Sequence, residues 1–234
     1  MNAETPLLIS HIPKTAGTSL RKLVEQFNPD AVLAYDRELA LGNPNAEFIR
    51  NFKSRPQPKV VLGHFSFGVH KLLDVPPRYA SIFRDPIQRV ISLYWYQKSH
   101  PNSPFAKELQ SGMSLGEFVL SGCTAMTNNH MCRMVAGIAP QPGVFLNERW
   151  MLDQALYNLK NYYQVIGVVE NYGQALTQLA EILGWKEFEI PKENVTPGKV
   201  TDIDDVTYEI LHEYNELDIE LFKTIMKMHQ PSQV

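Results

Sequence analysis

The chain has 234 residues, of which 44% are apolar and 20% are charged, and its formal net charge is −3. These values are typical of one globular domain over residues 1–234 and exclude a disordered chain or a strongly basic nucleic-acid-binding protein. Residues 1–100 carry 13 basic and 8 acidic side chains, whereas residues 101–234 carry 9 and 17. The first half is therefore the expected place for an anion site, and the alternative is a pair of ordinary solvated surfaces.

The N-terminal sequence and the cysteines bear on localisation. The first ten residues lack the basic and apolar regions of a signal peptide, and no stretch approaches the roughly 18 apolar residues of a membrane helix. We therefore expect a cytoplasmic protein without a membrane span. Cys123 and Cys132 are too few for a disulfide framework and lack metal-binding spacing, so free thiols are expected.

Short apolar runs alternate with segments of helical spacing. The runs predict buried strands at residues 7–11, 31–35, 60–63, 79–83 and 165–169. Helical spacing and helix-start signals predict helices at residues 19–27, 86–98, 128–136, 148–160, 172–183 and 204–228. Ser114 and Glu117 form a capping box that starts a further short helix. The alternation predicts an α/β fold of three layers, with a mostly parallel central sheet flanked by helices.

The segment His11-Ile-Pro-Lys-Thr-Ala-Gly-Thr-Ser19 lies between the first predicted strand and the first helix. A loop of small residues at a helix start presents backbone N–H groups to a phosphate, and Lys14 adds a positive charge. The Walker A pattern places its lysine directly after the second glycine, whereas Lys14 lies three residues before Gly17. The segment is therefore a phosphate loop of another type, or a plain strand–helix turn capped by Ser19.

A second candidate segment runs from Arg84 to Tyr96, with the sequence RDPIQRVISLYWY. Arg84 ends a predicted strand, at the sheet edge where open α/β folds bind ligands. Ser92 follows eight residues later, and a guanidinium with a hydroxyl can clamp a phosphate. The alternative is that Arg84 pairs with an acidic residue and Ser92 only packs within the helix.

Together the two segments resemble the sulfotransferases that use 3′-phosphoadenosine 5′-phosphosulfate (PAPS). The resemblance is greatest to the carbohydrate branch, of the heparan sulfate 2-O- and chondroitin type, and its bacterial relatives. PKTAGTS at residues 13–19 matches the 5′-phosphosulfate loop, and residues 84–96 match the 3′-phosphate segment RDPxxRxxSxYxY. Weaker matches lie at residues 63–64, 128–133, 167–170 and 194–199. The resemblance implies a P-loop-like fold and in-line transfer of a sulfuryl group to an acceptor hydroxyl, without a metal.

The same resemblance implies roles for individual residues. The 5′-phosphosulfate would be held by the loop residues Lys14, Thr15, Ala16, Gly17, Thr18 and Ser19. Arg84 and Ser92 would bind the 3′-phosphate, and Lys199 in a late NVTPGK loop would add a second contact. Lys14 would also neutralise the charge that develops on the leaving phosphate oxygen.

His64 is the candidate general base, because it follows a predicted strand at the edge where the phosphate loop lies. It matches the histidine base of the 2-O-sulfotransferase branch, whose local pattern is HGH, although the first of those positions is Leu62 here. His70 is the alternative base, and His11 is expected to be structural. A hydrogen-bonded loop histidine is the alternative reading of His64.

The acceptor is expected to be a hydroxyl compound, a carbohydrate or glycoconjugate, rather than a nucleic acid. His70, Arg133 and Glu170 are candidate substrate-binding residues, although a surface salt bridge fits Arg133 and a helix cap fits Glu170 equally well. The variable segments 36–58 and 99–128 are the expected walls of the acceptor pocket, whose ligand the sequence does not determine. Two other functions stay open: a P-loop kinase, and a non-catalytic nucleotide-binding module.

Overall fold

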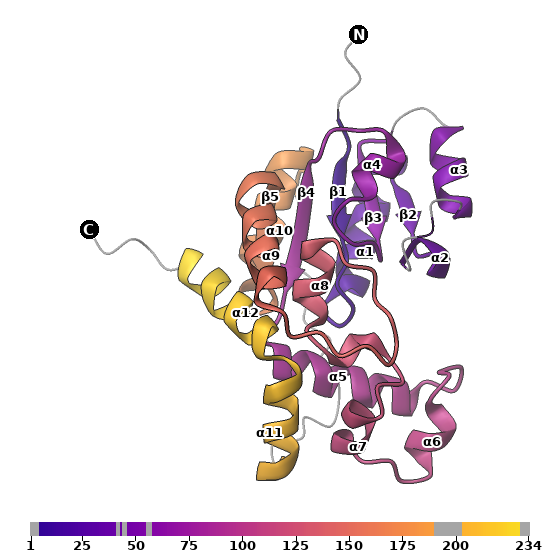
Figure 1. Cartoon of the computed structure of the whole chain (residues 1–234). Helices are drawn as coiled ribbons and strands as arrows, with labels where there is room; N and C mark the ends of the chain where they lie inside the picture. Colours follow the sequence, from indigo (N-terminus) through magenta and orange to yellow (C-terminus); the bar gives the residue numbers. More distant parts are fainter. Residues whose placement is uncertain (1–4, 41–42, 44–45, 55–57, 190–202, 230–234) are drawn as a thin grey trace.

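A parallel sheet forms the centre of the molecule (Figure 1). The computed structural model describes residues 5–40, 43, 46–54, 58–189 and 203–229. Five strands lie in the order β2-β3-β1-β4-β5, and every pairing among them is parallel. They are β1 (Leu7–Ser10), β2 (Val32–Ala34), β3 (Val60–Gly63), β4 (Tyr79–Phe83) and β5 (Tyr163–Val168). The strands predicted from the apolar runs are confirmed, with ends that differ by one or two residues.

Helices occupy most of the chain between and after the strands. Those of the first half are α1 (Gly17–Phe27), α2 (Arg37–Ala40), α3 (Glu47–Lys53), α4 (Val69–Leu73), α5 (Pro86–Ser99), α6 (Ala106–Gln110) and α7 (Leu115–Leu120). Those of the second half are η1 (Ala125–Thr127), α8 (His130–Ala136), α9 (Arg149–Tyr162), η2 (Val169–Asn171), α10 (Tyr172–Leu183), α11 (Asp205–Tyr214) and α12 (Glu216–Met228). The capping box of Ser114 and Glu117 is present at the start of α7, as predicted.

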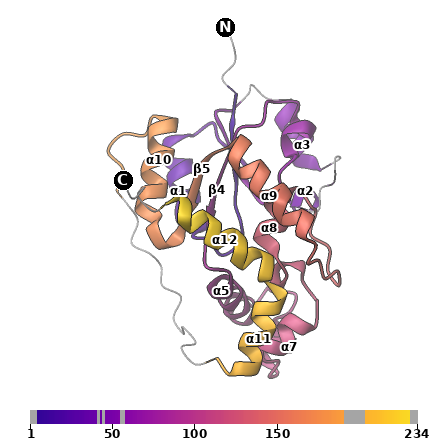
Figure 2. The ribbon, with the colours of Figure 1, turned by 60° about the vertical axis from the view of Figure 1, so that its left-hand side comes forward.

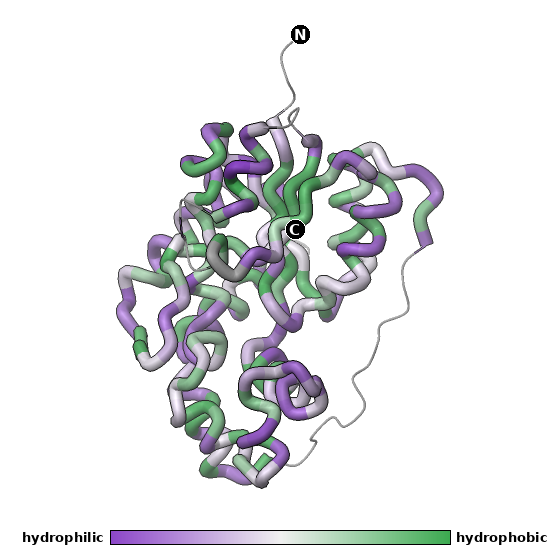
Figure 3. Tube along the Cα trace, turned by 90° about the vertical axis from the view of Figure 1, so that its right-hand side faces the viewer, coloured by the Kyte–Doolittle hydropathy of each residue, from purple (hydrophilic) through white to green (hydrophobic). Residues whose placement is uncertain are grey.

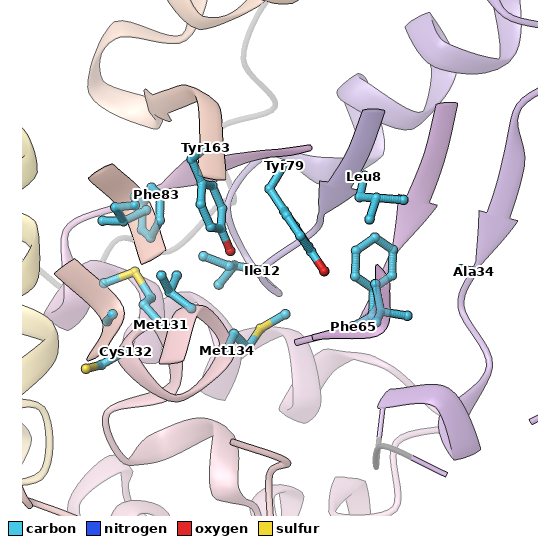
Figure 4. Packing of buried hydrophobic residues seen from close by; sticks show 14 of the residues in the cluster. Leu8, Ile12, Ala34, Phe65, Tyr79, Phe83, Met131, Cys132, Met134 and Tyr163 are labelled. Carbon is cyan, nitrogen blue, oxygen red and sulfur yellow. The ribbon is translucent and has the colours of Figure 1, made fainter. Parts of the chain in front are cut away.

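The sheet is buried on both faces, which gives three layers. Successive strand residues point to opposite faces, so Leu7 and Ile9 pack against α1 and α10 while Leu8 packs on the other side. Figure 2 shows α1 and α10 on one side of the sheet and α3, α8 and α9 on the other. Apolar residues follow the strands through the centre (Figure 3), and Tyr79 and Phe83 of β4 share one buried cluster with Met131 and Met134 of α8 (Figure 4). The predicted α/β architecture with a parallel sheet is confirmed.

A second group of helices lies beyond the carboxyl ends of the strands (Figure 1). Helix α5 leaves β4 and packs with α6, α7 and α11 around small apolar clusters that include Val90, Leu93 and Phe118. Because α5 begins where β4 ends, this group fixes the direction in which the segment after Arg84 leaves the sheet.

The single helix predicted over residues 204–228 is wrong, because the chain turns between α11 and α12 at Asn215. Asn215 is fully buried, and its side-chain amide donates to the carbonyls of Thr127 (3.1 Å) and Leu211 (3.0 Å). An asparagine amide that bonds the backbone competes with the helical pattern. The helical spacing continues through this turn, which is why the sequence does not reveal it.

The structure also describes the two cysteines and the lengths of the helices. Cys132 is buried in α8 and Cys123 is partly buried, and both are free thiols. Among the described residues, no helix combines the length and apolar character needed to cross a bilayer.

Candidate functional site

The loop between β1 and α1 has a backbone conformation that side chains rarely adopt. Lys14 and Ala16 have positive φ angles of 73° and 62°. Thr15 is buried, and its hydroxyl donates to the carbonyl of Ile12 at 2.8 Å, which closes the loop on itself. Ala16 is the N-cap of α1 and makes no side-chain cap, so the serine cap of the alternative interpretation is wrong. Helix α1 instead starts at Gly17, and its first N–H groups face the loop.

Position 17 requires glycine because the side chain of His11 lies close to its Cα atom. A Cβ atom at this position would lie 1.6 Å from Nε2 of His11, so the imidazole occupies the space that any other residue would fill. Burial, followed by the nearby His64 and Lys14 as smaller causes, lowers the pKa of His11 to about 3. The neutral ring of His11 therefore packs directly under the start of α1.

The two segments singled out in the sequence meet at this loop. Arg84 follows β4, and its Nη1 donates to the carbonyl of Lys14 at 3.2 Å, across 70 residues of sequence. Nζ of Lys14 lies 4.1 Å from the ring centroid of Tyr96 in α5. Burial lowers the pKa of Lys14, and the positive charge of Arg84 lowers it further. Two cationic side chains therefore lie together beside the N-terminus of α1.

The start of α5 is fixed by capping interactions. Asp85 is its N-cap and accepts from the N–H of Gln88 at 2.9 Å, and Pro86 occupies the first turn. Glu170 of η2 accepts from the backbone N–H of Asp85 at 2.9 Å. Glu170 was expected either to bind substrate or to cap a helix. This contact fits the helix cap, although the helix whose start it supports is α5 and not α10. Ser92 is buried within α5, nearly two turns after Pro86.

His64 follows β3, directly beside His11 at the end of the neighbouring strand. Its Nδ1 lies 2.8 Å from the carbonyl oxygen of His11. A carbonyl only accepts, so Nδ1 carries the proton and the neutral ring keeps a lone pair on Nε2. Burial lowers the pKa of His64, while the bond to the His11 carbonyl opposes that shift. His64 is partly buried, and its ring stacks on that of His11 with centroids 4.6 Å apart.

The structure places two other candidates in buried, hydrogen-bonded positions. The hydroxyl of Tyr79 accepts from the N–H groups of Gly68 and His70, both at 3.2 Å, and donates to Nδ1 of His70 at 2.9 Å. Arg133 is fully buried in α8, where Nη2 donates to the side chain of Asn128 and the carbonyl of Val144. The alternative of a surface salt bridge for Arg133 is therefore wrong, because its guanidinium is buried and donates to groups within the protein.

Several residues of this region were missed from the sequence. Tyr35 directly follows β2 and contacts both His11 and His64, and its place after a predicted strand was the one signal that the sequence offered for it. Arg89 and Asp218 form a fully buried pair, with Nη2 3.9 Å from Oδ2, and no spacing in the sequence connects them. Lys199 lies outside the described residues.

The comparison with protein families covers nearly the whole chain. A model described as "Sulfotransferase family" matches residues 1–223. Heparan sulfate 2-O-sulfotransferase 1 of Xenopus laevis is 27% identical over 186 residues, which cover 70% of this chain and 51% of that protein. The Homo sapiens protein of the same name has the same identity and coverage. The chain thus spans about half the length of the curated relatives it matches.

Two more distant similarities are to a second carbohydrate-named relative and to a solved structure. Uronyl 2-sulfotransferase of Homo sapiens is 22% identical over 152 residues, which cover 60% of this chain and 37% of that protein. A crystal structure of mouse sulfotransferase SULT7A1 complexed with PAP aligns with 98% of this chain and 68% of its own, at 14% identity and a TM-score of 0.44. On the strength of the family model, which matches residues 1–223, this chain belongs to the sulfotransferase family.

Proposed function

We propose that this protein transfers a sulfuryl group from PAPS to a hydroxyl group of a carbohydrate. One observation carries the proposal: Arg84 donates to the carbonyl of Lys14 in the loop before α1, and His64, whose ring stacks on His11 under that helix start, keeps a lone pair on Nε2. Membership of the sulfotransferase family favours this activity over that of a P-loop kinase.

The donor would bind through its negative charges. The 5′-phosphosulfate would lie at the loop, where the N–H groups of the first turn of α1 and the hydroxyls of Thr18 and Ser19 donate to its oxygens. Arg84 would bind the 3′-phosphate from the end of β4, with Ser92 of α5 and Lys199 as further contacts. An anion between Lys14 and Arg84 would also relieve the repulsion that lowers the pKa of Lys14.

The reaction would be an in-line displacement at sulfur. The acceptor hydroxyl oxygen attacks the sulfur, and the bond from sulfur to the bridging oxygen of the 5′-phosphate breaks. The hydroxyl proton passes to Nε2 of His64, while the proton on Nδ1 stays there and remains hydrogen-bonded to the carbonyl of His11. Lys14 neutralises the charge on the leaving phosphate oxygen, as cationic groups do in phosphoryl transfer. The products are a sulfate ester and adenosine 3′,5′-bisphosphate.

The acceptor class comes from the names of the relatives. Both kinds of relative are named for transfer to the 2-position of a sugar residue, in heparan sulfate or in a uronyl residue. We therefore extend the proposal to a sugar hydroxyl. We expect the residues that select one sugar to lie in segments 36–58 and 99–128, because the fold itself does not fix the substrate.

Calorimetric binding of adenosine 3′,5′-bisphosphate, beside 5′-AMP and ATP, tests the donor site. We expect the 3′-phosphate to strengthen binding, and we expect Arg84→Ala to remove that gain. Arg78→Ala is the matched control, because Arg78 precedes β4 at the opposite edge of the sheet and bonds Gln164 and the carbonyl of Thr5. Equal or tighter binding of ATP would favour the kinase.

Transfer of labelled sulfate to a panel of glycans, glycolipids and small alcohols tests the reaction. We expect His64→Ala to lower turnover by roughly 10²–10⁴-fold, the usual contribution of a positioned base, without weakening binding of the nucleotide. Nucleotide binding without transfer to any acceptor would support a non-catalytic module and overturn the proposal.

A further inference from the structure

We propose that His11 and Tyr35 are positioning residues that hold the imidazole of His64 with Nε2 free and tie its orientation to the phosphate loop. The proposal rests on the proposed function, since it assigns these residues to the same site. It adds Tyr35, at the end of a strand that contributes none of the donor or base residues named above, and it gives His11 a role beyond packing.

The strand order brings the three residues together. Ser10 of β1 and Ala34 of β2 both pair with Gly63 of β3. The next residue of each strand is therefore at the same level, with His64 between Tyr35 on one side and His11 on the other. The ladder continues one step beyond the strands, because the N–H of His11 donates to Gly63 at 2.8 Å and that of His64 to Ala34 at 2.9 Å. These main-chain bonds fix where the three side chains start.

The rings then form a closed triangle. His64 stacks on His11 with an interplanar angle of 30°, and it meets the ring of Tyr35 edge-on, with centroids 4.8 Å apart. A hydrogen bond of 3.0 Å joins Nδ1 of His11 to the hydroxyl of Tyr35 and closes the third side. A rotation of His64 that moved its Nδ1 proton away from the His11 carbonyl would have to displace one of the other two rings.

The same triangle contacts α1 at two places. Nε2 of His11 fills the space beside Gly17, at the first residue of the helix. The guanidinium of Arg21, one turn further along α1, lies 5.4 Å from the ring centroid of Tyr35. A shift of the phosphate loop or of α1 is therefore transmitted to the side chains that hold the base.

The charge state of His11 suits this role. A histidine kept neutral by burial stacks on His64 without opposing the positive charge that His64 gains when it accepts a proton. Its Nδ1 also stays available for the bond to the hydroxyl of Tyr35. A charged partner at the same distance would disfavour proton transfer to His64.

Two variants separate the contributions of the pair. Tyr35→Phe removes the hydroxyl but keeps the ring edge that faces His64. His11→Asn keeps a polar atom that can meet Tyr35 but removes the ring that stacks on His64 and packs on Gly17. The matched control is Tyr163→Phe, because the hydroxyl of Tyr163 is buried with no hydrogen-bond partner in the part of the chain that the structure describes.

Long-range ¹H–¹⁵N spectra of the histidine rings read the tautomer of His64 directly, without an activity assay. In the wild type we expect His64 to be protonated at Nδ1 only, and in both variants we expect a mixture of tautomers. In the transfer assay we expect kcat to fall about tenfold in each variant, a part of what a general base contributes, with KM for PAPS unchanged. Tyr163→Phe should change neither readout.

The outcomes distinguish this proposal from the proposed function. An unchanged His64 tautomer in both variants would overturn the positioning role, whether or not the protein transfers sulfate. A tautomer that shifts while the wild type fails to transfer sulfate would instead overturn the proposed function, and with it the catalytic part of this one. A kcat loss matched by Tyr163→Phe would show a general effect of core changes, and the assignment would fail.

Discussion

Replacement of Gly17 by alanine is the sharpest test of the loop geometry. The new Cβ would lie 1.6 Å from Nε2 and 1.9 Å from Cε1 of His11, whereas ordinary contact begins at 3.4 Å. The difference between 3.4 Å and 1.6 Å is 1.8 Å. The imidazole of His11 or the start of α1 would have to move by about that distance to relieve the clash. The ring has little freedom to move, because it stacks on His64 and bonds Tyr35.

Overpacking of this kind costs roughly 1–3 kcal/mol, which exceeds the benefit of at most about 1 kcal/mol that alanine brings to a helix. We therefore expect Gly17→Ala to lower the free energy of unfolding by about 1–2 kcal/mol in urea titrations. Binding of adenosine 3′,5′-bisphosphate should weaken as well, because the N–H groups of the first turn of α1 would move with the loop.

The matched control is Gly116→Ala in α7. Its Cβ would lie 3.4 Å from Oγ1 of Thr207 and 3.5 Å from Cδ1 of Ile210, which is ordinary contact. Helix propensity then acts without a clash, so Gly116→Ala should raise the free energy of unfolding by up to about 1 kcal/mol. The two substitutions should thus change stability in opposite directions. A Gly17→Ala protein as stable as the wild type would refute the packing of His11 against α1.

Three further predictions concern buried polar groups. Asp218→Ala leaves Arg89 buried without its acidic partner, so urea unfolding should show a loss of about 3–5 kcal/mol, and a loss under about 1 kcal/mol would contradict this. Trp185→Phe removes the 2.6 Å hydrogen bond that Nε1 donates to Oδ1 of the buried Asn28, so the same titration should show a loss of about 1–3 kcal/mol. The unfolded chain protonates His11 near its ordinary pKa of 6.5 but the folded chain only near 3, so stability is fully present above pH 6.5 and falls as the pH is lowered through this window. Between about pH 8 and pH 5 this term is worth about 2 kcal/mol, which His11→Asn should remove.

Local sequence patterns were sufficient to predict the strands and the proximity of the two motifs. Strands β1, β3 and β4 are buried along their whole length and β2 and β5 along part of it, so their apolar runs stand out in the sequence. Lys14 and Arg84 each follow a strand, and parallel strands end at one edge, which is why segments 70 residues apart meet. These conclusions need only the direction of each strand.

Strand order and burial were not predictable in the same way. The place of Tyr35 beside His64 depends on β2 lying next to β3 at the edge of the sheet, and no pattern in the sequence specifies that order. Arg133 belongs to a residue type that is usually exposed, and its burial depends on acceptors at Asn128 and Val144 that only the folded chain supplies. The turn at Asn215 likewise depends on Thr127, 88 residues earlier.

The loop between β1 and α1 shows how such long-range contacts support a local conformation. A left-handed backbone costs a residue with a side chain roughly 1–2 kcal/mol, and the loop contains Lys14 and Ala16 in that state. Glycine would remove the cost at position 14, but it would also remove the ammonium group. The carbonyl of Lys14 instead accepts from Arg84, and the carbonyl of Ala16 accepts the first helical bonds of α1. The same contacts that compensate the strain also bring the second cation to the loop, so the conformation and the proposed anion site depend on each other.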